Sequence, residues 1–100
     1  RSAEEPMLDW TDHDPEAVFD LHGQPVAQAV AAAEKFLQVQ ARARPGAVVR
    51  VITGRGKSGG GAPTRTRVRT LLRALRDGGS VIRDYVLEDS EGSFLIRLGG

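Results

Sequence analysis

Residues 48–75 read VVRVITGRGKSGGGAPTRTRVRTLLRAL. The first five are almost all β-branched, which predicts a strand that is covered on both faces or nearly so. Five glycines follow within Gly54–Gly61, and a backbone without side chains can turn its N–H groups toward an anion. Leucine and valine then recur at helical spacing over Val68–Leu75. We therefore expect a strand, a phosphate-binding loop and a helix, with the rest of the chain positioning that loop.

The length and composition indicate one folded domain. The chain has 100 residues, of which 40% are hydrophobic and 27% are charged. It holds no apolar run long enough to span a membrane, so we expect no membrane partner. It also has no cysteine, which excludes disulfides, thiol catalysis and cysteine-ligated zinc, and we expect a cytoplasmic protein. The first residue is Arg1 rather than Met, which suggests a piece of a longer parent chain whose other domains are candidate partners.

The net charge of +1 hides an uneven distribution of charge. Acids predominate in residues 1–34 and again in residues 77–100, whereas residues 35–76 contain no acid at all. A block of one sign around a glycine-rich loop predicts a polyanionic partner, and the alternative is a solvated surface that favours arginine. The eleven bases of this block are Lys35, Arg42, Arg44, Arg50, Arg55, Lys57, Arg65, Arg67, Arg69, Arg73 and Arg76.

The remaining segments predict alternating strands and helices. Residues 1–16 are acidic and lack periodicity, so we expect an extended lead-in before a domain of residues 17–100. The expected elements are a strand Ala17–Leu21, a helix Val26–Ala41, a strand Val48–Ile52, a helix between Pro63 and Gly78, and strands Val81–Leu87 and Ser93–Leu98.

This order of elements predicts the fold class. Two strand–helix–strand units call for parallel neighbouring strands with right-handed crossovers, and the closing hairpin adds an antiparallel strand. Two helices are too few to cover both faces of four strands. We therefore expect an α/β two-layer sandwich, with a mixed four-stranded sheet and both helices on one face.

The glycine-rich segment falls short of two nucleotide-binding motifs. A P-loop would need glycine where Val51 stands. Residues 54–59 do match G-x-G-x-x-G, but four more residues, 60–63, precede the expected helix. The basic surroundings also fit a polymer of phosphates better than one pyrophosphate. A surface loop without any ligand is the remaining alternative.

Asp20 and His22 form a second candidate site at the end of the first strand. Alternation along a strand places both on the same side, and sites in parallel sheets gather at the carboxyl ends of strands. We therefore expect this corner beside the Thr53–Gly59 bend. His22 would act as general acid or base, Asp20 would orient it or hold a metal, and Arg55 or Lys57 would stabilise phosphorane charge. Structurally, Asp20 could instead cap the turn while His22 packs beneath the loop.

The lead-in carries two further features. Trp10 could stack on a base, but we interpret it as a packing anchor for an otherwise loose segment. His13 lies between Asp12 and Asp14, which could bind a metal ion. A solvated acidic loop is the better interpretation, so we assign no metal ligands.

Phe19–Gly23, Ile52–Gly56 and the order of elements together resemble the Smr (small MutS-related) domain over residues 17–98. The resemblance implies a two-layer α/β fold similar to the C-terminal domain of translation initiation factor three. It also implies DNA or RNA binding and, for many members, endonuclease activity by DNA nicking or RNA cleavage. Some members are stimulated by metal, so Mg²⁺ or Mn²⁺ is a candidate cofactor.

The family's two motifs map onto this chain with one informative departure. The L-D-x-H-G motif falls on Phe19–Gly23, with Phe19 in place of the usual leucine. The second motif, often H-G-x-G, reads Thr53-Gly54-Arg55-Gly56 and looks like the T-G-R-G form of other members. Because threonine does not transfer protons near neutral pH, a mechanism that needs two histidines does not carry over.

We predict a nucleic-acid endonuclease domain in which Asp20 and His22 are catalytic. A non-catalytic DNA- or RNA-binding module of a larger protein is the alternative, and a protein-interaction adaptor is a third class. The residues predicted to contact nucleic acid are Thr53, Gly54, Arg55, Gly56, Lys57, Ser58, Gly59, Arg65, Arg67 and Arg69.

Overall fold

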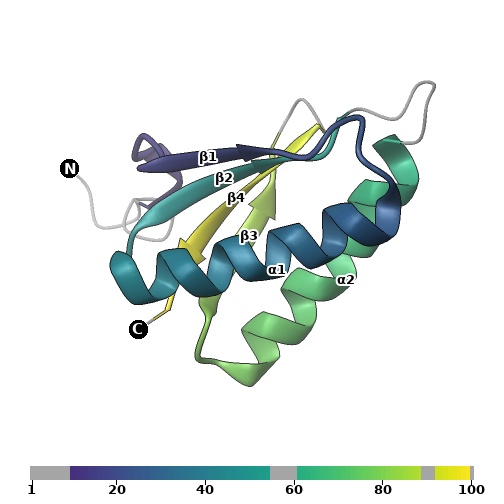
Figure 1. Ribbon diagram of the computed structural model, residues 1–100. Coiled ribbons are helices and arrows are strands. Elements are labelled where there is room, and N and C mark those ends of the chain that lie inside the picture. Colours follow the sequence, from purple (N-terminus) through teal and green to yellow (C-terminus); the bar gives the residue numbers. More distant parts are fainter. Residues whose placement is uncertain (1–9, 55–60, 89–91, 100) are drawn as a thin grey trace.

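A computed structural model describes residues 10–54, 61–88 and 92–99. Figure 1 shows two helices lying on one face of a sheet. The predicted fold class, an α/β two-layer sandwich with a mixed four-stranded sheet, is confirmed. In chain order the elements are β1 (Ala17–Asp20), α1 (Val26–Ala43), β2 (Val48–Ile52), α2 (Gly61–Gly78), β3 (Ile82–Leu87) and β4 (Ser93–Leu98).

The strands lie in the order β1-β2-β4-β3. β1 pairs with β2 in parallel, and β4 runs antiparallel to both β2 and β3. β2 and β3 are therefore parallel but not neighbours, so the expectation that each crossover joins adjacent strands is wrong for the crossover through α2. The physical reason is the apolar sequence of β4, whose Phe94, Ile96 and Leu98 have no exposed area. Such a strand is best buried at the centre of the sheet.

The core lies between the sheet and the helices. Ala29 and Ala33 on α1 have no exposed area, and their small side chains let the helix approach the sheet closely, as the alanine-rich face predicts. Phe36 of α1 stacks on Phe19 of β1, with 4.8 Å between ring centroids. On α2, Val68 and Leu72 are buried in the same core cluster, and Leu71 and Leu75 are partly buried against it. Among the described residues, neither helix is long and apolar enough to cross a membrane.

The ends of α2 explain how it follows the glycine-rich segment. The helix begins at Gly61, so residues 61–63 belong to it, contrary to the expectation that they precede it. Pro63 is tolerated because the first turn of a helix has N–H groups without intrahelical partners. At the other end Gly79 adopts φ +80°, and its N–H donates to Leu75 O at 3.1 Å. The predicted stop at Gly78–Gly79 is confirmed.

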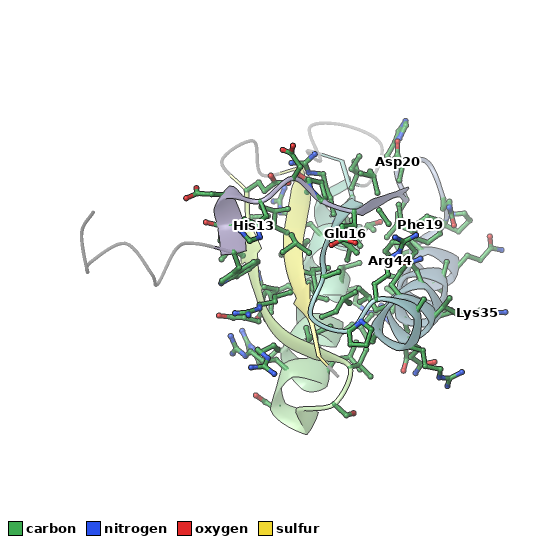
Figure 2. All side chains as sticks on the ribbon, turned by 90° about the vertical axis from the view of Figure 1, so that its left-hand side faces the viewer. His13, Glu16, Phe19, Asp20, Lys35 and Arg44 are labelled. Atoms are coloured by element: carbon green, nitrogen blue, oxygen red, sulfur yellow. The ribbon has the colours of Figure 1, made fainter. Side chains whose placement is uncertain are left out.

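The opposite face of the sheet carries the described end of the lead-in. In Figure 2 the turn at residues 10–12 lies on the side of the sheet away from the helices. The N–H of Glu16 donates to Val48 O at 2.8 Å, and Trp10 is half-buried. The earlier part of the lead-in, residues 1–9, lies outside the described residues.

Candidate active site

The corners that follow β1 and β2 lie side by side. Asp20 is the register partner of Ile52, and the N–H of Leu21 donates to Ile52 O at 2.7 Å, one residue beyond β1. The predicted juxtaposition is therefore confirmed for Thr53 and Gly54. Figure 1 shows that α1 and α2 both begin at this end of the molecule. The predicted contacts Arg55, Gly56, Lys57, Ser58 and Gly59 lie outside the described residues.

Asp20 and His22 are joined by two hydrogen bonds to one oxygen atom. Oδ1 of Asp20 accepts the backbone N–H of His22 at 3.0 Å and lies 2.9 Å from its Nδ1. An ionised carboxylate only accepts hydrogen bonds, so Nδ1 carries the proton and the neutral ring has its lone pair on Nε2. The side chain of Asp20 is 49% exposed, and that of His22 is 70% exposed. Asp20 thus caps the turn, as the structural interpretation expected, whereas the side chain of His22 is exposed rather than packed.

The charge state of Asp20 supports this arrangement. The backbone N–H of His22, followed by its ring, lowers the pKa of the Asp20 carboxyl below its ordinary value, against a smaller opposing effect of burial. The carboxylate is therefore ionised throughout the neutral range. The ionised carboxylate also holds the ring by Nδ1, so Nε2 is the ring nitrogen that faces a substrate proton.

Thr53 has a structural role at the second corner. It is 1% exposed, and its hydroxyl lies 3.3 Å from the carbonyl of Gly54 and 3.4 Å from that of Gly92, so its one proton is shared between them. The N–H groups of Thr53 and Gly54 both donate to Gly92 O, at 2.8 and 3.0 Å. In this geometry the polar groups of the corner face the backbone before β4. The N–H groups of Thr53 and Gly54 are therefore already bonded within the protein.

The predicted arginines of α2 do not lie on one face. Arg67 and Arg69 are exposed, and neither forms an ion pair within the described parts of the chain. Arg67 lines a hollow that it shares with Val26 of α1. Arg69 lies about 200° further around the helix, on the same side as Arg76, which covers the ring of Tyr85 on β3 at 5.0 Å. Arg65 is half-buried and already engaged with another group.

Among the described residues, three bases of the positive block pair with acids from outside it. Each pair joins the block to a segment outside it, so the surface is less positive than the block alone predicts. The pairs are Arg44 with Glu16 at 3.7 Å, Arg50 with Glu88 at 2.9 Å, and Arg76 with Asp84 at 3.5 Å.

The Arg50–Glu88 pair was not foreseen from the sequence. Arg50 donates to both carboxylate oxygens of Glu88, at 2.9 and 3.0 Å, and the hydroxyl of Ser93 donates to the same group at 2.5 Å. Burial alone would raise the pKa of Glu88, but the hydrogen bonds from Arg50 and Ser93 and the charge of Arg50 outweigh it and lower that pKa. The sequence did contain a signal for this pair, because Arg50 is the one charged residue in a strand of β-branched residues. A half-buried charge in such a strand needs a partner of opposite charge.

The described residues do not by themselves fit a metal ion. Across the described ranges, no three His, Cys, Asp or Glu side chains converge. His13 lies apart from Asp20, next to the turn that precedes β1 (Figure 2). Asp20 is left as one carboxylate, and one of its oxygens already holds His22. Mg²⁺ requires several further oxygen ligands, so we derive no chemical step through a metal ion.

Comparisons with known proteins bear on this site. A family model described as the Smr domain matches residues 19–98, from Phe19 in β1 to Leu98 in β4. The match includes both corners and confirms the resemblance inferred from the motifs. A comparison with curated proteins and another with solved structures each find no match.

Proposed function

Because the chain belongs to the Smr domain family, which implies a nucleic-acid-related endonuclease or binding function in general, we propose that it cleaves phosphodiester bonds in DNA or RNA through Asp20 and His22. The observation that carries the proposal is the 2.9 Å contact between Asp20 Oδ1 and His22 Nδ1 on an exposed corner. It leaves Nε2 accessible to a substrate while Asp20 holds the ring.

The proposed chemistry uses His22 first as a base and then as an acid. Nε2 accepts a proton from the nucleophile, which is water or a ribose 2′-hydroxyl, as the new O–P bond forms. The Asp20 carboxylate stabilises the imidazolium. The bond from phosphorus to the leaving oxygen then breaks, and the imidazolium returns the proton to that oxygen.

Arginine and lysine side chains supply the proposed phosphate contacts. Arg67 and Arg69 are exposed on α2, which begins at the same end of the molecule as the Asp20–His22 corner. Guanidinium groups bind phosphate oxygens through paired hydrogen bonds and offset the charge that develops on phosphorus. We assign the same phosphate-binding role to Arg55 and Lys57 from the sequence alone.

A binding module without catalysis is the second candidate, and Thr53 favours it. The threonine hydroxyl is buried and bonded to backbone carbonyls, so within the described residues His22 has no second proton-transfer group at the adjoining corner. Such a module would bind nucleic acid without turnover. Its affinity would fall with salt, with a logarithmic slope of about −0.7 to −0.9 for each phosphate neutralised.

A cleavage assay with a matched histidine control tests the proposal. Labelled single- and double-stranded DNA and RNA are incubated with wild type, His22→Ala and His13→Ala, each with Mg²⁺, Mn²⁺ or EDTA. We expect His13→Ala to cleave like wild type and His22→Ala to lose about 10²- to 10⁴-fold in rate.

The arms of this assay separate the candidates. Equal cleavage by wild type and His22→Ala removes His22 from the chemistry. Salt-dependent binding with no cleavage by any of the proteins establishes the binding module instead. Loss of wild-type cleavage in EDTA, restored by Mg²⁺ or Mn²⁺, establishes a metal cofactor.

A further inference from the structure

A hollow of about 490 Å³ lies between the start of α1 and the first two turns of α2. Val26 of α1 and Pro63 of α2 form apolar walls, and Thr66 and Arg67 of α2 add a hydroxyl and a guanidinium group. Its volume is comparable to that of a small organic ligand, and it is open to solvent, so a ligand there stays partly exposed. An apolar wall beside a cation is the pairing that an organic anion requires.

The charges around this hollow distinguish it from two others of similar volume. Hollows of about 460 and 400 Å³ include Arg76 and Arg42 respectively, in the last turns of α2 and α1. Helix C-termini present carbonyl oxygens with partial negative charge, which oppose an anion. The first hollow lies at two N-terminal ends, and neither helix has an acid in its first turn. Its guanidinium and both helix dipoles therefore favour the same sign of ligand.

The hollow is close to the Asp20–His22 corner along the chain. Val26 follows His22 by four residues, and four residues reach at most about 14 Å. Nucleotides of one strand of B-DNA are spaced by about 3.4 Å along the helix axis. A strand with its phosphate at His22 can therefore place a nucleotide in the hollow within about four positions of that phosphate.

We propose that this hollow binds one nucleotide of the nucleic-acid strand, with its base or sugar against Val26 and Pro63 and its phosphate on Arg67. The inference rests on the proposed function, because it places the nucleotide within about four positions of the bond that His22 acts on. In this proposal Arg67 and Arg69 have different roles. Arg67 holds the phosphate of the bound nucleotide, whereas Arg69, on the β3 side of α2, contacts only the sugar-phosphate backbone elsewhere on the nucleic-acid strand.

An NMR titration tests the hollow without any cleavage. The ¹⁵N-labelled protein is titrated with a nucleoside 5′-monophosphate, and separately with the nucleoside and with inorganic phosphate. We expect the nucleotide to shift the amide signals of Val26, Thr66 and Arg67 and to bind more tightly than either part alone. Arg67→Ala should weaken nucleotide binding by about 10-fold, since it removes a charge-assisted hydrogen bond.

Two further variants complete the design. Thr66→Trp places a bulky ring at an exposed position on the rim and should abolish the shifts at Val26. Arg42→Ala removes an exposed arginine at the far end of α1 and should change affinity by less than about 2-fold.

Each contrary outcome overturns the inference. It is overturned if the amide signal of Val26 does not shift, or if inorganic phosphate binds as tightly as the nucleotide. It is also overturned if Thr66→Trp binds the nucleotide like wild type, or if Arg67→Ala and Arg42→Ala weaken binding equally. The cleavage assay separates this failure from that of the proposed function. If the protein cleaves nucleic acid but the nucleotide shifts no amide signal around the hollow, only the nucleotide site is refuted. A protein that binds the nucleotide there without cleaving any strand keeps the site and refutes the nuclease.

Discussion

The corners that follow β1 and β2 are neighbours with opposite designs. At the first, Asp20 is hydrogen-bonded to His22, two positions further along the chain, and both side chains are exposed to solvent. At the second, Thr53 is buried and bonds to Gly92, 39 positions along the chain. The first corner depends on few tertiary contacts, whereas the second joins β2 to the start of β4.

At this one edge of the sheet, the exposed corner therefore determines reactivity, and the buried corner contributes to stability. Substitutions at the exposed corner should change reactivity and leave the free energy of unfolding almost unaltered. Substitutions at the buried corner should lower that free energy, because they break contacts between distant segments. The following experiments test this division, from the largest expected effect to the smallest.

Asp20→Asn should have the largest effect, on cleavage alone. An amide can donate to Nδ1 of His22, which moves the ring proton to Nε2 and removes the base. We expect the cleavage rate to fall by about 10²- to 10⁴-fold, with a change of less than about 0.5 kcal/mol in unfolding free energy. Asp77→Asn, at an exposed position near the end of α2, is the matched control for both measurements. Cleavage at the wild-type rate by Asp20→Asn would show that the carboxylate does not position the ring.

Gly54→Ala should have the next largest effect, on stability. Gly54 has φ +91°, a left-handed conformation that costs other residues about 1–3 kcal/mol. Chemical denaturation should show a loss of that size. Gly78→Ala is the control, because Gly78 has no left-handed φ and no atom within 4 Å of an added Cβ. If the two substitutions cost the same, the buried corner is not held in the conformation described.

Glu88→Gln should have the smallest effect, and one that depends on pH. Glu88 and Ser93 close the hairpin that carries Gly92, so the substitution loosens the support of the buried corner. We expect a loss of about 1 kcal/mol at neutral pH, with Glu34→Gln on the surface of α1 as control.

The pH dependence of this effect has a definite sign. The pKa of Glu88 is lowered from the ordinary 4.5 in the folded protein, so its contribution is complete above about pH 4.5 and is lost as pH falls through the lower folded value. The stabilities of wild type and Glu88→Gln should therefore converge in acid. A difference that stays constant down to that range would contradict the role given to this carboxylate.

The sequence was enough to predict the elements and the meeting of the corners. Apolar periodicity located both helices, and the rule that parallel strands end at one edge brought Asp20 and His22 beside Thr53. These inferences need only local patterns and one rule of topology.

What the sequence did not reveal depends on non-local pairing. The pairing of β2 with β4, the bond from Thr53 to Gly92 and the pairing of Arg50 with Glu88 each join segments at least 38 residues apart. Helical spacing separates Arg67 from Arg69, but only the packing of α1 shows which of them faces the hollow.

The most direct test of the central claim is a ¹⁵N NMR measurement of the two histidine rings, with and without a non-cleavable phosphorothioate oligonucleotide. The account predicts that the neutral ring of His22 carries its proton on Nδ1, and that the oligonucleotide shifts the Nε2 signal of His22 while leaving His13 unchanged. A proton on Nε2 of His22, or no response of that ring to the oligonucleotide, would contradict the account.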